Sequence, residues 1–422
     1  MSLKCIVSSP VDTYSGYGAR ARDFIKALIS IKKEWDIYLL SQRWGDTRTG
    51  YLSDHNEIDL MSRIVPIVGT KPDIFIQITV PNEFQKIGRF NIGVTAGIET
   101  TLCDSSWITG CNNMDLVITS SQHSLNVFKT SKYNVVDSRT NENVNLLEIN
   151  TPLEVLFEGV DTEKYYNSPS SRFNLKGVQE DFCFLVVGHW LPGEFGHDRK
   201  NLGYTVKTFL EVFKNLAHPP ALLLKTQGST TSIMDREAIL SKINSIRRTV
   251  KGTLPNIYLI HGEVSDEEMN DLYNHPKVKA MISLTKGEGF GRPLLEFAAV
   301  GKPIIASGWS GHLDFLNPEQ AILIGGVLEN VHPSAAMKNA LIEEAKWFKP
   351  NEEDLVKAYK MVHTTYSKVK TVAKPLAKDV EENFSLEKMK EVLHDILERR
   401  VPNLPEKIEL KLPELPILQK VK

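Results

Sequence analysis

The sequence predicts an α/β protein with two parallel β-sheets, and three observations support this prediction. Short apolar runs alternate with amphipathic helical patterns, and the alternation occurs in two successive series. The polar segment of residues 167–177 separates the series and is typical of an interdomain linker. The 422 residues suffice for two or three domains, each with its own core.

The first series predicts an N-terminal domain, residues 1–170. Its clearest helix spans residues 18–33. The strands that we expect are residues 4–8, 36–40, 74–78, 91–95, 116–119 and 154–157. Short strands that alternate with helices in this way predict a Rossmann-like parallel sheet.

The second series predicts a C-terminal domain, residues 171–370, with a second Rossmann-like sheet. Residues 371–400 follow as C-terminal helices, and Ser385 can cap the last of them, which runs to about Arg399. Residues 401–422 carry four prolines and predict an extended tail. The expected strands of the second sheet are residues 183–187, 221–225, 257–260, 279–284 and 303–306.

Composition places the chain among ordinary globular proteins. It is 41% hydrophobic and 24% charged with a net charge of −2, which argues against a surface that binds polyanions generally. The four cysteines show no C-x-x-C spacing, and neither a signal peptide nor an apolar run of membrane-spanning length occurs. We therefore expect a reduced, cytoplasmic protein without a membrane span, and nothing indicates an obligate protein partner.

Residues 287–303 are the most informative stretch of the chain. They place two carboxylates around one loop-to-helix junction, Glu288 on the loop and Glu296 on the first helical turn. Both can accept hydrogen bonds from sugar hydroxyls, so together they can hold the two ends of one nucleotide sugar. The alternative is a solvated helix face with an ordinary capping loop.

The same junction predicts a phosphate site. Pro293 suits the first helical position and leaves the amides of Leu294 and Leu295 free to bind a diphosphate. Glycines in the preceding loop let the backbone approach a ligand closely. The donor-binding residues that we expect in this loop are Gly289, Phe290 and Gly291.

The string from Gly287 to Pro303 resembles the E-x7-E signature of retaining glycosyltransferases of the GT-B fold, glycosyltransferase family 4 in particular. The resemblance spans nearly the whole chain, from Ser8 to Phe384. It implies two Rossmann-like domains that face each other across a cleft, with a C-terminal helix that crosses back to the N-terminal domain. It also implies a nucleoside diphosphate sugar, in our interpretation a UDP-sugar, as co-substrate, and retention of the anomeric configuration.

Two adjacent cations, Arg199 and Lys200, lie between the first strand of the second series and the helix after it. A leaving nucleoside diphosphate needs positive charge, which this pair can supply. The pair resembles the family's basic pair, although many members place the arginine directly after the strand's glycine, where this chain has Gly188 and His189. Which cation contacts phosphate stays open, and an ordinary surface charge is the alternative.

The turn after the first strand carries Gly16 and Gly18 and enters a helix. It fits the dinucleotide fingerprint G-x-G-x-x-A, which raises an NAD-dependent oxidoreductase as an alternative. Against this alternative, the second strand ends in Ser41 and Gln42 where a ribose-binding acid would be expected. In the glycosyltransferases that the chain resembles, this loop lies under the donor phosphates, so both glycines are candidate donor-binding residues. A plain tight turn is the other interpretation.

Glu99 belongs to a segment that is similar to the acceptor loop of a family 4 subgroup, although Ile98 replaces that loop's tryptophan. The resemblance implies that Glu99 orients or deprotonates an acceptor hydroxyl. The alternative is a buried acid that caps a helix. The catalytic residues that we predict are therefore Glu288, Glu99, Arg199 and Lys200.

Neither a D-x-D motif nor a paired histidine spacing occurs, so we expect no metal and no other cofactor. A non-catalytic sensor of nucleotide sugars is an alternative from a different class. The presence of Glu288, which should serve the sugar and not the nucleotide, disfavours the sensor.

Resemblance alone suggests the acceptor. Residues 82–84 and 97–101 look most like glycosyltransferases of large tailed phages, which implies a hydroxymethylated pyrimidine in DNA as acceptor and the host cytoplasm as location. Against DNA, residues 1–170 hold 16 Lys and Arg against 20 Asp and Glu. A glycan or small-molecule acceptor is the alternative.

One local surface could still meet DNA phosphates. Arg22, Lys26 and Lys33 fall close to one face of the helix expected over residues 18–33. A solvated helix face is the competing interpretation of these three residues.

Overall fold

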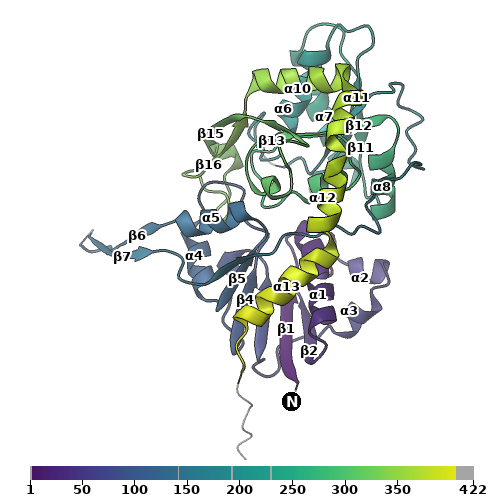
Figure 1. The fold of residues 1–422 in the computed structure, drawn as a ribbon. Coiled ribbons are helices and arrows are strands. Elements are labelled where there is room, and N and C mark those ends of the chain that lie inside the picture. Colours follow the sequence, from purple (N-terminus) through teal and green to yellow (C-terminus); the bar gives the residue numbers. More distant parts are fainter. Residues whose placement is uncertain (1, 141, 192, 229–230, 405–422) are drawn as a thin grey trace, which may run out of the picture.

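The computed structural model describes residues 2–140, 142–191, 193–228 and 231–404. Two six-stranded parallel sheets with surrounding helices form the two halves of the molecule (Figure 1). The predicted α/β class with two parallel sheets is confirmed. Most of the tail predicted over residues 401–422 lies outside the described residues.

The N-terminal sheet has the strand order β2-β1-β3-β4-β5-β8. Every strand expected in this half is present within two residues of its expected bounds, and α1 (Gly16–Ile31) matches the expected helix. The strands are β1 (Leu3–Ser9), β2 (Trp35–Ser41), β3 (Ile74–Ile78), β4 (Phe90–Val94), β5 (Leu116–Thr119) and β8 (Leu153–Val155).

The C-terminal sheet has the order β11-β10-β9-β12-β13-β14. All five expected strands are present, and β14 is an edge strand that the sequence analysis missed. The strands are β9 (Cys183–Val187), β10 (Ala221–Lys225), β11 (Ile257–Ile260), β12 (Val278–Ser283), β13 (Ile304–Ser307) and β14 (Ile322–Ile324).

Alternation along the strands of the C-terminal sheet builds a core on each of its faces. Cys183 and Leu185 of β9 belong to one buried cluster, which contains residues of α8, α9 and α12. Phe184 and Val186 belong to another, which contains residues of α6, α7 and α10. Because successive side chains of a strand point to opposite faces, a continuous apolar run indicates a strand that is covered on both sides.

The helices differ in length and fall into two groups. Those of the N-terminal half after α1 are α2 (Tyr51–Asp54), α3 (Ile58–Ser62), α4 (Ser105–Asn112) and α5 (Gln122–Thr130). Those from the C-terminal half onward are α6 (Leu202–Phe213), α7 (Ile233–Thr249), α8 (Asp266–Asn274), α9 (Arg292–Ala298), α10 (Glu352–Thr364), α11 (Tyr366–Ala373), α12 (Pro375–Phe384) and α13 (Leu386–Arg400). No helix within the described ranges is long and apolar enough to cross a membrane.

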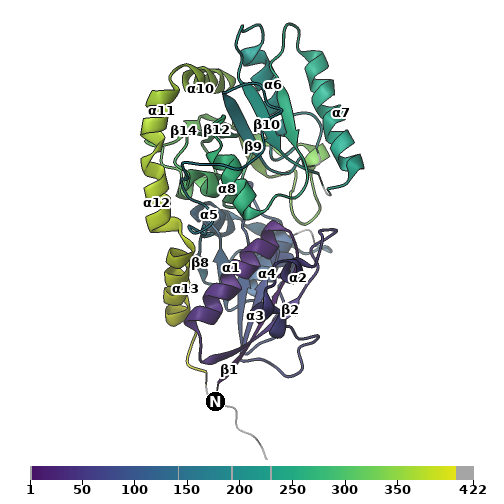
Figure 2. The same cartoon turned by 90° about the vertical axis from the view of Figure 1, so that its right-hand side faces the viewer.

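The last helix returns to the N-terminal half, as expected. Helices α10 to α13 descend along one side of the molecule, and α13 lies beside α1 (Figure 2). Met389, Leu393 and Ile396 of α13 join the core of the N-terminal half, and Ser385 caps the helix by accepting from Lys388 N. The predicted C-terminal crossover is therefore confirmed.

The chain passes between the halves twice, and the two crossings are hydrogen-bonded to each other. Val160 N donates to Phe384 O at 2.8 Å, and Leu386 N donates to Val160 O at 2.9 Å. A Cβ on Gly159 would lie only 2.7 Å from the Cα of Leu386. The crossings can pack this closely because residue 159 is a glycine.

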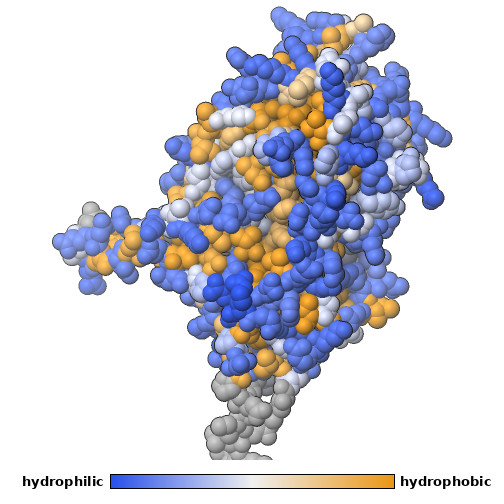
Figure 3. Space-filling model, viewed as in Figure 1, coloured by the Kyte–Doolittle hydropathy of each residue, from blue (hydrophilic) through white to orange (hydrophobic). Residues whose placement is uncertain are grey.

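Two antiparallel hairpins are additions that the sequence analysis did not anticipate. The first, β6 (Tyr133–Val136) and β7 (Asn143–Leu147), projects from the N-terminal half and carries apolar side chains along its length (Figures 1 and 3). The second, β15 (Gly326–Asn330) and β16 (Lys346–Pro350), belongs to the C-terminal half. The second hairpin reaches the contact between the halves.

Candidate active site

The predicted catalytic residues of the C-terminal half lie on loops that follow two neighbouring strands. Arg199 and Lys200 end the loop after β9, and Glu288 lies on the loop after β12. β9 and β12 are adjacent in the sheet although β10 and β11 separate them in sequence. In open α/β sheets, ligands bind beyond the carboxyl ends of the strands at such a reversal of strand order.

Glu288 is buried and paired with both cations. Its Oε1 lies 2.5 Å from Lys200 Nζ, and its Oε2 lies 3.3 Å from Arg199 Nη1. Burial raises the pKa of Glu288, but Lys200 and Arg199 outweigh burial and lower the pKa to about 2. The carboxylate is therefore ionised at neutral pH, and it can only accept hydrogen bonds.

Arg199 also connects the two halves. Its Nη2 lies 3.5 Å from Oε1 of Glu99, which follows β4 in the N-terminal half. Burial lowers the pKa of Arg199, but Glu99 and Glu288 outweigh burial and raise it. The guanidinium is thus a permanent cation between two acids, and the structure brings all four predicted catalytic residues together.

Glu296 lies on α9 and belongs to a second ionic group. Its Oε1 lies 3.2 Å from Arg292 Nε, and Nη1 of Arg292 lies 2.7 Å from Oδ2 of Asp23 on α1. Burial raises the pKa of Glu296 to about 7 and outweighs the opposing effect of Arg292. This carboxyl group therefore changes its charge near neutral pH.

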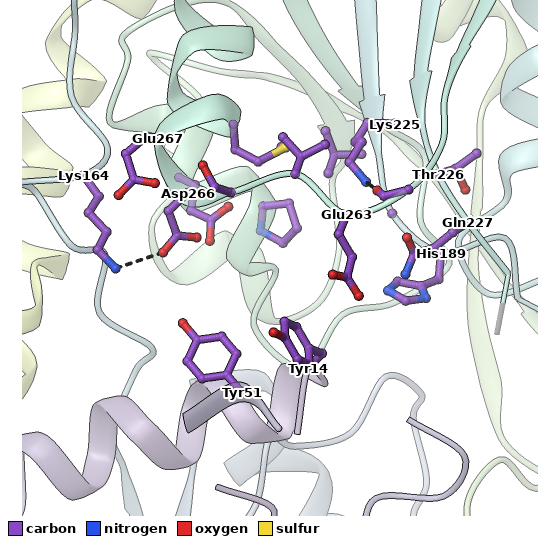
Figure 4. A pocket seen from close by; sticks show the side chains of 18 of the residues that line it. Tyr14, Tyr51, Lys164, His189, Lys225, Thr226, Gln227, Glu263, Asp266 and Glu267 are labelled. Carbon is purple, nitrogen blue, oxygen red and sulfur yellow. Dashed lines mark hydrogen bonds and ion pairs between the residues drawn. The ribbon is translucent and has the colours of Figure 1, made fainter. Parts of the chain in front are cut away.

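Glu296 lines a cavity of about 670 Å³ with walls from both halves. This volume lies within the range of small-molecule sites. Tyr14 and Tyr51 of the N-terminal half face Glu263 and Asp266 of the C-terminal half across the cavity (Figure 4). The two walls are also joined directly, since Arg48 Nη1 lies 2.7 Å from Glu263 Oε2.

Gly188 links this cavity to the cluster around Glu288. It lines the cavity, and a Cβ on it would lie 3.8 Å from Cδ of Lys200. A ligand that fills the cavity therefore comes close to the basic pair. His189 also lines the cavity, and burial lowers its pKa, so the histidine that follows Gly188 is neutral at neutral pH.

The glycines of the loop at residues 287–291 contact the N-terminal half, which differs from the ligand-binding role that we expected. A Cβ on Gly287 would lie 1.9 Å from Glu99 O, and a Cβ on Gly289 would lie 2.1 Å from Ala96 O. Ser120 Oγ donates to Gly289 O at 3.1 Å from the same side. We expected these glycines to admit a ligand, whereas here they admit the backbone of the N-terminal half.

The start of α9 also corrects the sequence analysis. Leu294 N and Leu295 N both donate to Gly291 O, at 2.9 and 3.2 Å, so their amides are not free to bind a diphosphate. Gly291 is the N-cap residue with φ of 101°, which lets its carbonyl accept both bonds. Phe290 is buried in the core against Phe315, with ring centroids 5.1 Å apart, and offers no side-chain contact to a donor.

The two glycines of the first turn have different surroundings. Gly18 N donates to Oγ of Ser15, the N-cap of α1, and a Cβ on Gly18 would lie 2.3 Å from Thr13 O. Gly18 is therefore required by the turn itself, which was the alternative interpretation. Gly16 is exposed and has no atom within 4 Å of a Cβ position, so its backbone is open to a ligand.

The three basic residues that could have met DNA phosphates do not form one exposed face, because Arg22 is buried. Nη1 of Arg22 donates to two backbone carbonyls in the turn before α1, and the guanidinium lies 3.3 Å from the ring centroid of Tyr51. Lys26 is exposed and its Nζ pairs with Glu57 at 2.5 Å, while Lys33 is exposed but lies beyond the end of α1. Arg22 is buried, and it packs against Tyr51, an aromatic residue of the cavity wall.

The β15–β16 hairpin forms a further bridge between the halves, close to Glu99. Thr101 N donates to Lys346 O at 2.9 Å. Trp107 Nε1 on α4 donates to Asn339 O in the hairpin connection at 2.5 Å. Sequence reasoning missed this bridge because the connection carries no short hairpin-turn signal.

Sequence reasoning also missed most of the cavity wall. Lys225 ends β10 and Thr226 and Gln227 follow it, while Gly262 and Glu263 follow β11. Both strands were predicted, and the carboxyl ends of parallel strands share one edge of the sheet, so these positions could have been found. Within the described ranges, no group of three or more His, Cys, Asp or Glu could hold a metal ion.

Residues 251–361 match the family model described as Glycosyl transferases group 1. The matched segment contains Glu288 and Glu296, the two carboxylates of the E-x7-E signature. No curated protein matches the chain.

Several solved structures share the fold over nearly the whole chain. Anabaena HepE in complex with UDP and glucose is 13% identical with a TM-score of 0.63, covering 94% of this chain and 100% of its own. A glycosyltransferase from Rickettsia africae is 14% identical with a TM-score of 0.62, covering 96% and 100%. Sucrose-phosphate synthase from Thermosynechococcus elongatus is 12% identical with a TM-score of 0.60, covering 94% and 99%.

At these identities the solved structures establish the architecture, and they confirm the expected GT-B arrangement of two Rossmann-like halves. The match to the family model covers the segment in which both signature carboxylates lie. The chain is therefore a glycosyltransferase of the GT-B fold.

Proposed function

We propose that the protein transfers a sugar from a nucleoside diphosphate sugar to a hydroxyl group, with retention of configuration and without a metal ion. The observation that carries the proposal is that Lys200, which is paired with Glu288 beside Arg199, lies next to Gly188 in the wall of a cavity that Glu296 also lines. In this proposal Glu288 holds the sugar, Glu296 holds the ribose, and the two cations stabilise the leaving diphosphate.

The basic pair fits this role because both cations already lie in one place. Lys200 Nζ is a compact point charge, whereas Arg199 offers a planar fork of donors. Arg199 is engaged with Glu99, Glu288 and Gly287 O, at 3.5, 3.3 and 2.8 Å. Lys200 is therefore the better candidate for the diphosphate, and Arg199 for fixing the two acids.

Retention without a covalent intermediate requires the acceptor hydroxyl to attack from the face that the diphosphate leaves. Glu99 lies across the contact from Glu288, joined to it through Arg199. A carboxylate in this place can orient an acceptor hydroxyl beside the leaving group. No covalent nucleophile enters the proposal, since positioning and electrostatic stabilisation supply the catalysis.

For the donor we propose a UDP-sugar. The support is the structural similarity to Anabaena HepE, which was solved with UDP and glucose and with UDP-glucose. For the acceptor we propose a hydroxymethylated pyrimidine in DNA, supported by the resemblance of residues 82–84 and 97–101 to phage enzymes. The alternative acceptor is a glycan or a small molecule, and the burial of Arg22 and pairing of Lys26 favour that alternative.

A donor and acceptor screen tests the proposal. The protein is incubated with a panel of UDP-, GDP- and ADP-sugars, and mass spectrometry follows consumption of each donor with and without hydroxymethylcytosine DNA. We expect one donor to be hydrolysed slowly alone, which a sensor would not do, and to add its mass to the DNA nucleoside. Transfer to a glycan with no mass gain in DNA would refute the proposal that DNA is the acceptor, but the proposed sugar transfer would stand.

A further inference from the structure

The turn after β13 holds the backbone of Glu288 from both sides. Glu288 N donates to Oγ of Ser310 at 2.9 Å, and Gly311 N donates to Glu288 O at 2.9 Å. Both contacts come from residues 308–311, the sequence Gly-Trp-Ser-Gly. The side chain of Glu288 is held separately by the basic pair, so the turn fixes the peptide from which this side chain extends.

Ser310 adopts an unusual backbone conformation to make its contact. Its φ of 86° and ψ of −163° lie in a region that is essentially restricted to glycine. A glycine at position 310 could adopt this conformation without strain. It would, however, remove the hydroxyl that accepts from the Glu288 amide, so the chain keeps a strained serine where a glycine would relieve the backbone.

The neighbours of Ser310 leave the turn little freedom. A Cβ on Gly311 would lie 2.1 Å from Gly289 O, and a Cβ on Gly287 would lie 3.0 Å from Cζ3 of Trp309. The turn therefore packs along the whole of residues 287–289. Ser310 itself is buried, and its Oγ is the side-chain atom of this turn that accepts from the centre of that loop.

We propose that Ser310 is a positioning residue, which orients Glu288 toward the donor sugar through the Glu288 amide. The inference rests on the proposed function, because it needs Glu288 to act on the sugar. Ser310 touches the backbone of Glu288 and not its carboxylate. Its loss should therefore lower turnover while nucleotide binding, which depends on Glu296 and the cavity, is retained.

Two variants distinguish a positioning role of Ser310 from a role in stability alone. Ser310→Ala removes the hydroxyl and keeps the backbone strain, whereas Ser310→Gly removes both. Ser310→Gly should therefore melt at a higher temperature than Ser310→Ala. If Ser310 served stability alone, Ser310→Gly would also recover turnover. If Ser310 positions Glu288, both variants lose turnover by about tenfold or more.

The matched control is Ser307→Ala. The Ser307 hydroxyl is also buried near this loop, and it donates to Thr285 O at 2.7 Å without touching Glu288. Its removal should lower the melting temperature, as Ser310→Ala does, with turnover reduced less than about threefold.

The experiment measures turnover of the donor found in the screen, UDP affinity by calorimetry, and amide exchange of the peptide that contains Glu288 by mass spectrometry. We expect both Ser310 variants to lose turnover, to keep UDP affinity within about threefold, and to exchange the Glu288 amide faster than wild type and Ser307→Ala. Wild-type turnover in Ser310→Gly, or an unchanged exchange rate of the Glu288 amide in both variants, would overturn the inference about Ser310 and leave the proposed function standing. A wild-type protein that binds no UDP and consumes no nucleotide sugar would instead refute the proposed function, and the inference with it.

Discussion

Asp23 and Arg292 join the two halves of the molecule at the edge of the cavity, with Oδ2 and Nη1 2.7 Å apart. The same arginine reaches Glu296, the carboxylate proposed to bind the ribose, through Nε at 3.2 Å. The contact between the halves and the proposed nucleotide site therefore share one guanidinium. Domain contact and nucleotide binding should depend on each other.

Asp23→Asn tests this dependence. It removes one charge from a largely buried ion pair, and the remaining amide cannot hold Arg292 as firmly. We expect UDP affinity to fall about three- to tenfold, measured by calorimetry. Asp59→Asn is the control, because Asp59 is exposed and pairs with Arg63 away from the cavity. Equal affinities in the two variants would contradict the coupling.

Glu296 should make the stability of the folded protein depend on pH. Its pKa is raised from 4.5 to about 7, so the stability associated with it is fully present below about pH 4.5 and is lost as pH rises through 7. Glu296→Gln removes this loss and should be more stable than wild type at pH 8, by on the order of 3 kcal/mol, but not at pH 5. Thermal unfolding at both pH values measures the difference, and a constant difference would contradict the assignment.

Lys200→Ala should reduce donor affinity and turnover together. Loss of a charge-assisted hydrogen bond to the diphosphate costs about 1.5 to 3 kcal/mol, or roughly ten- to a hundredfold in binding. Lys251→Ala, at an exposed lysine, serves as the control. Initial rates with a chelator added should equal those without it, and strict dependence on Mg²⁺ or Mn²⁺ would contradict the metal-independent proposal.

Gly289→Ala should disturb the contact between the halves. The added Cβ would lie 2.1 Å from Ala96 O, so one backbone must move. We expect a lower melting temperature and turnover reduced at least tenfold. Gly177→Ala is the matched control, since a Cβ there meets no atom within 4 Å. If both variants behaved like wild type, the close contact between Gly289 and the N-terminal half would be refuted.

The strands could be predicted from the sequence because each is a local apolar run. The five strands expected in the C-terminal sheet fall within one residue of their expected bounds, since each contains an unbroken apolar run. Glu288 and Glu296 were found in the same way, from a pattern within one stretch of chain. The edge strand β14 has three residues, too few for such a signal.

Contacts between distant segments could not be predicted in this way. Arg22 has the spacing of a solvated helix residue, but the turn before α1 and the ring of Tyr51 bury it. Gly287 and Gly289 have the composition of a ligand loop, but residues 96–99 pack against them. The spacing of residues in the sequence shows which of them lie on the same face of a helix or loop. Only the tertiary fold determines what packs against that face.

The central claim is that Glu288 serves the donor sugar, and Glu288→Gln tests it most directly. The measurement is donor consumption by mass spectrometry, paired with UDP affinity by calorimetry, in the wild type and in this variant. The variant loses the sugar contact and the charge that pairs with Lys200 and Arg199, but both cations remain available to the diphosphate. We therefore expect turnover to fall below detection while UDP affinity stays largely intact. Sugar transfer by Glu288→Gln at the wild-type rate would contradict the account.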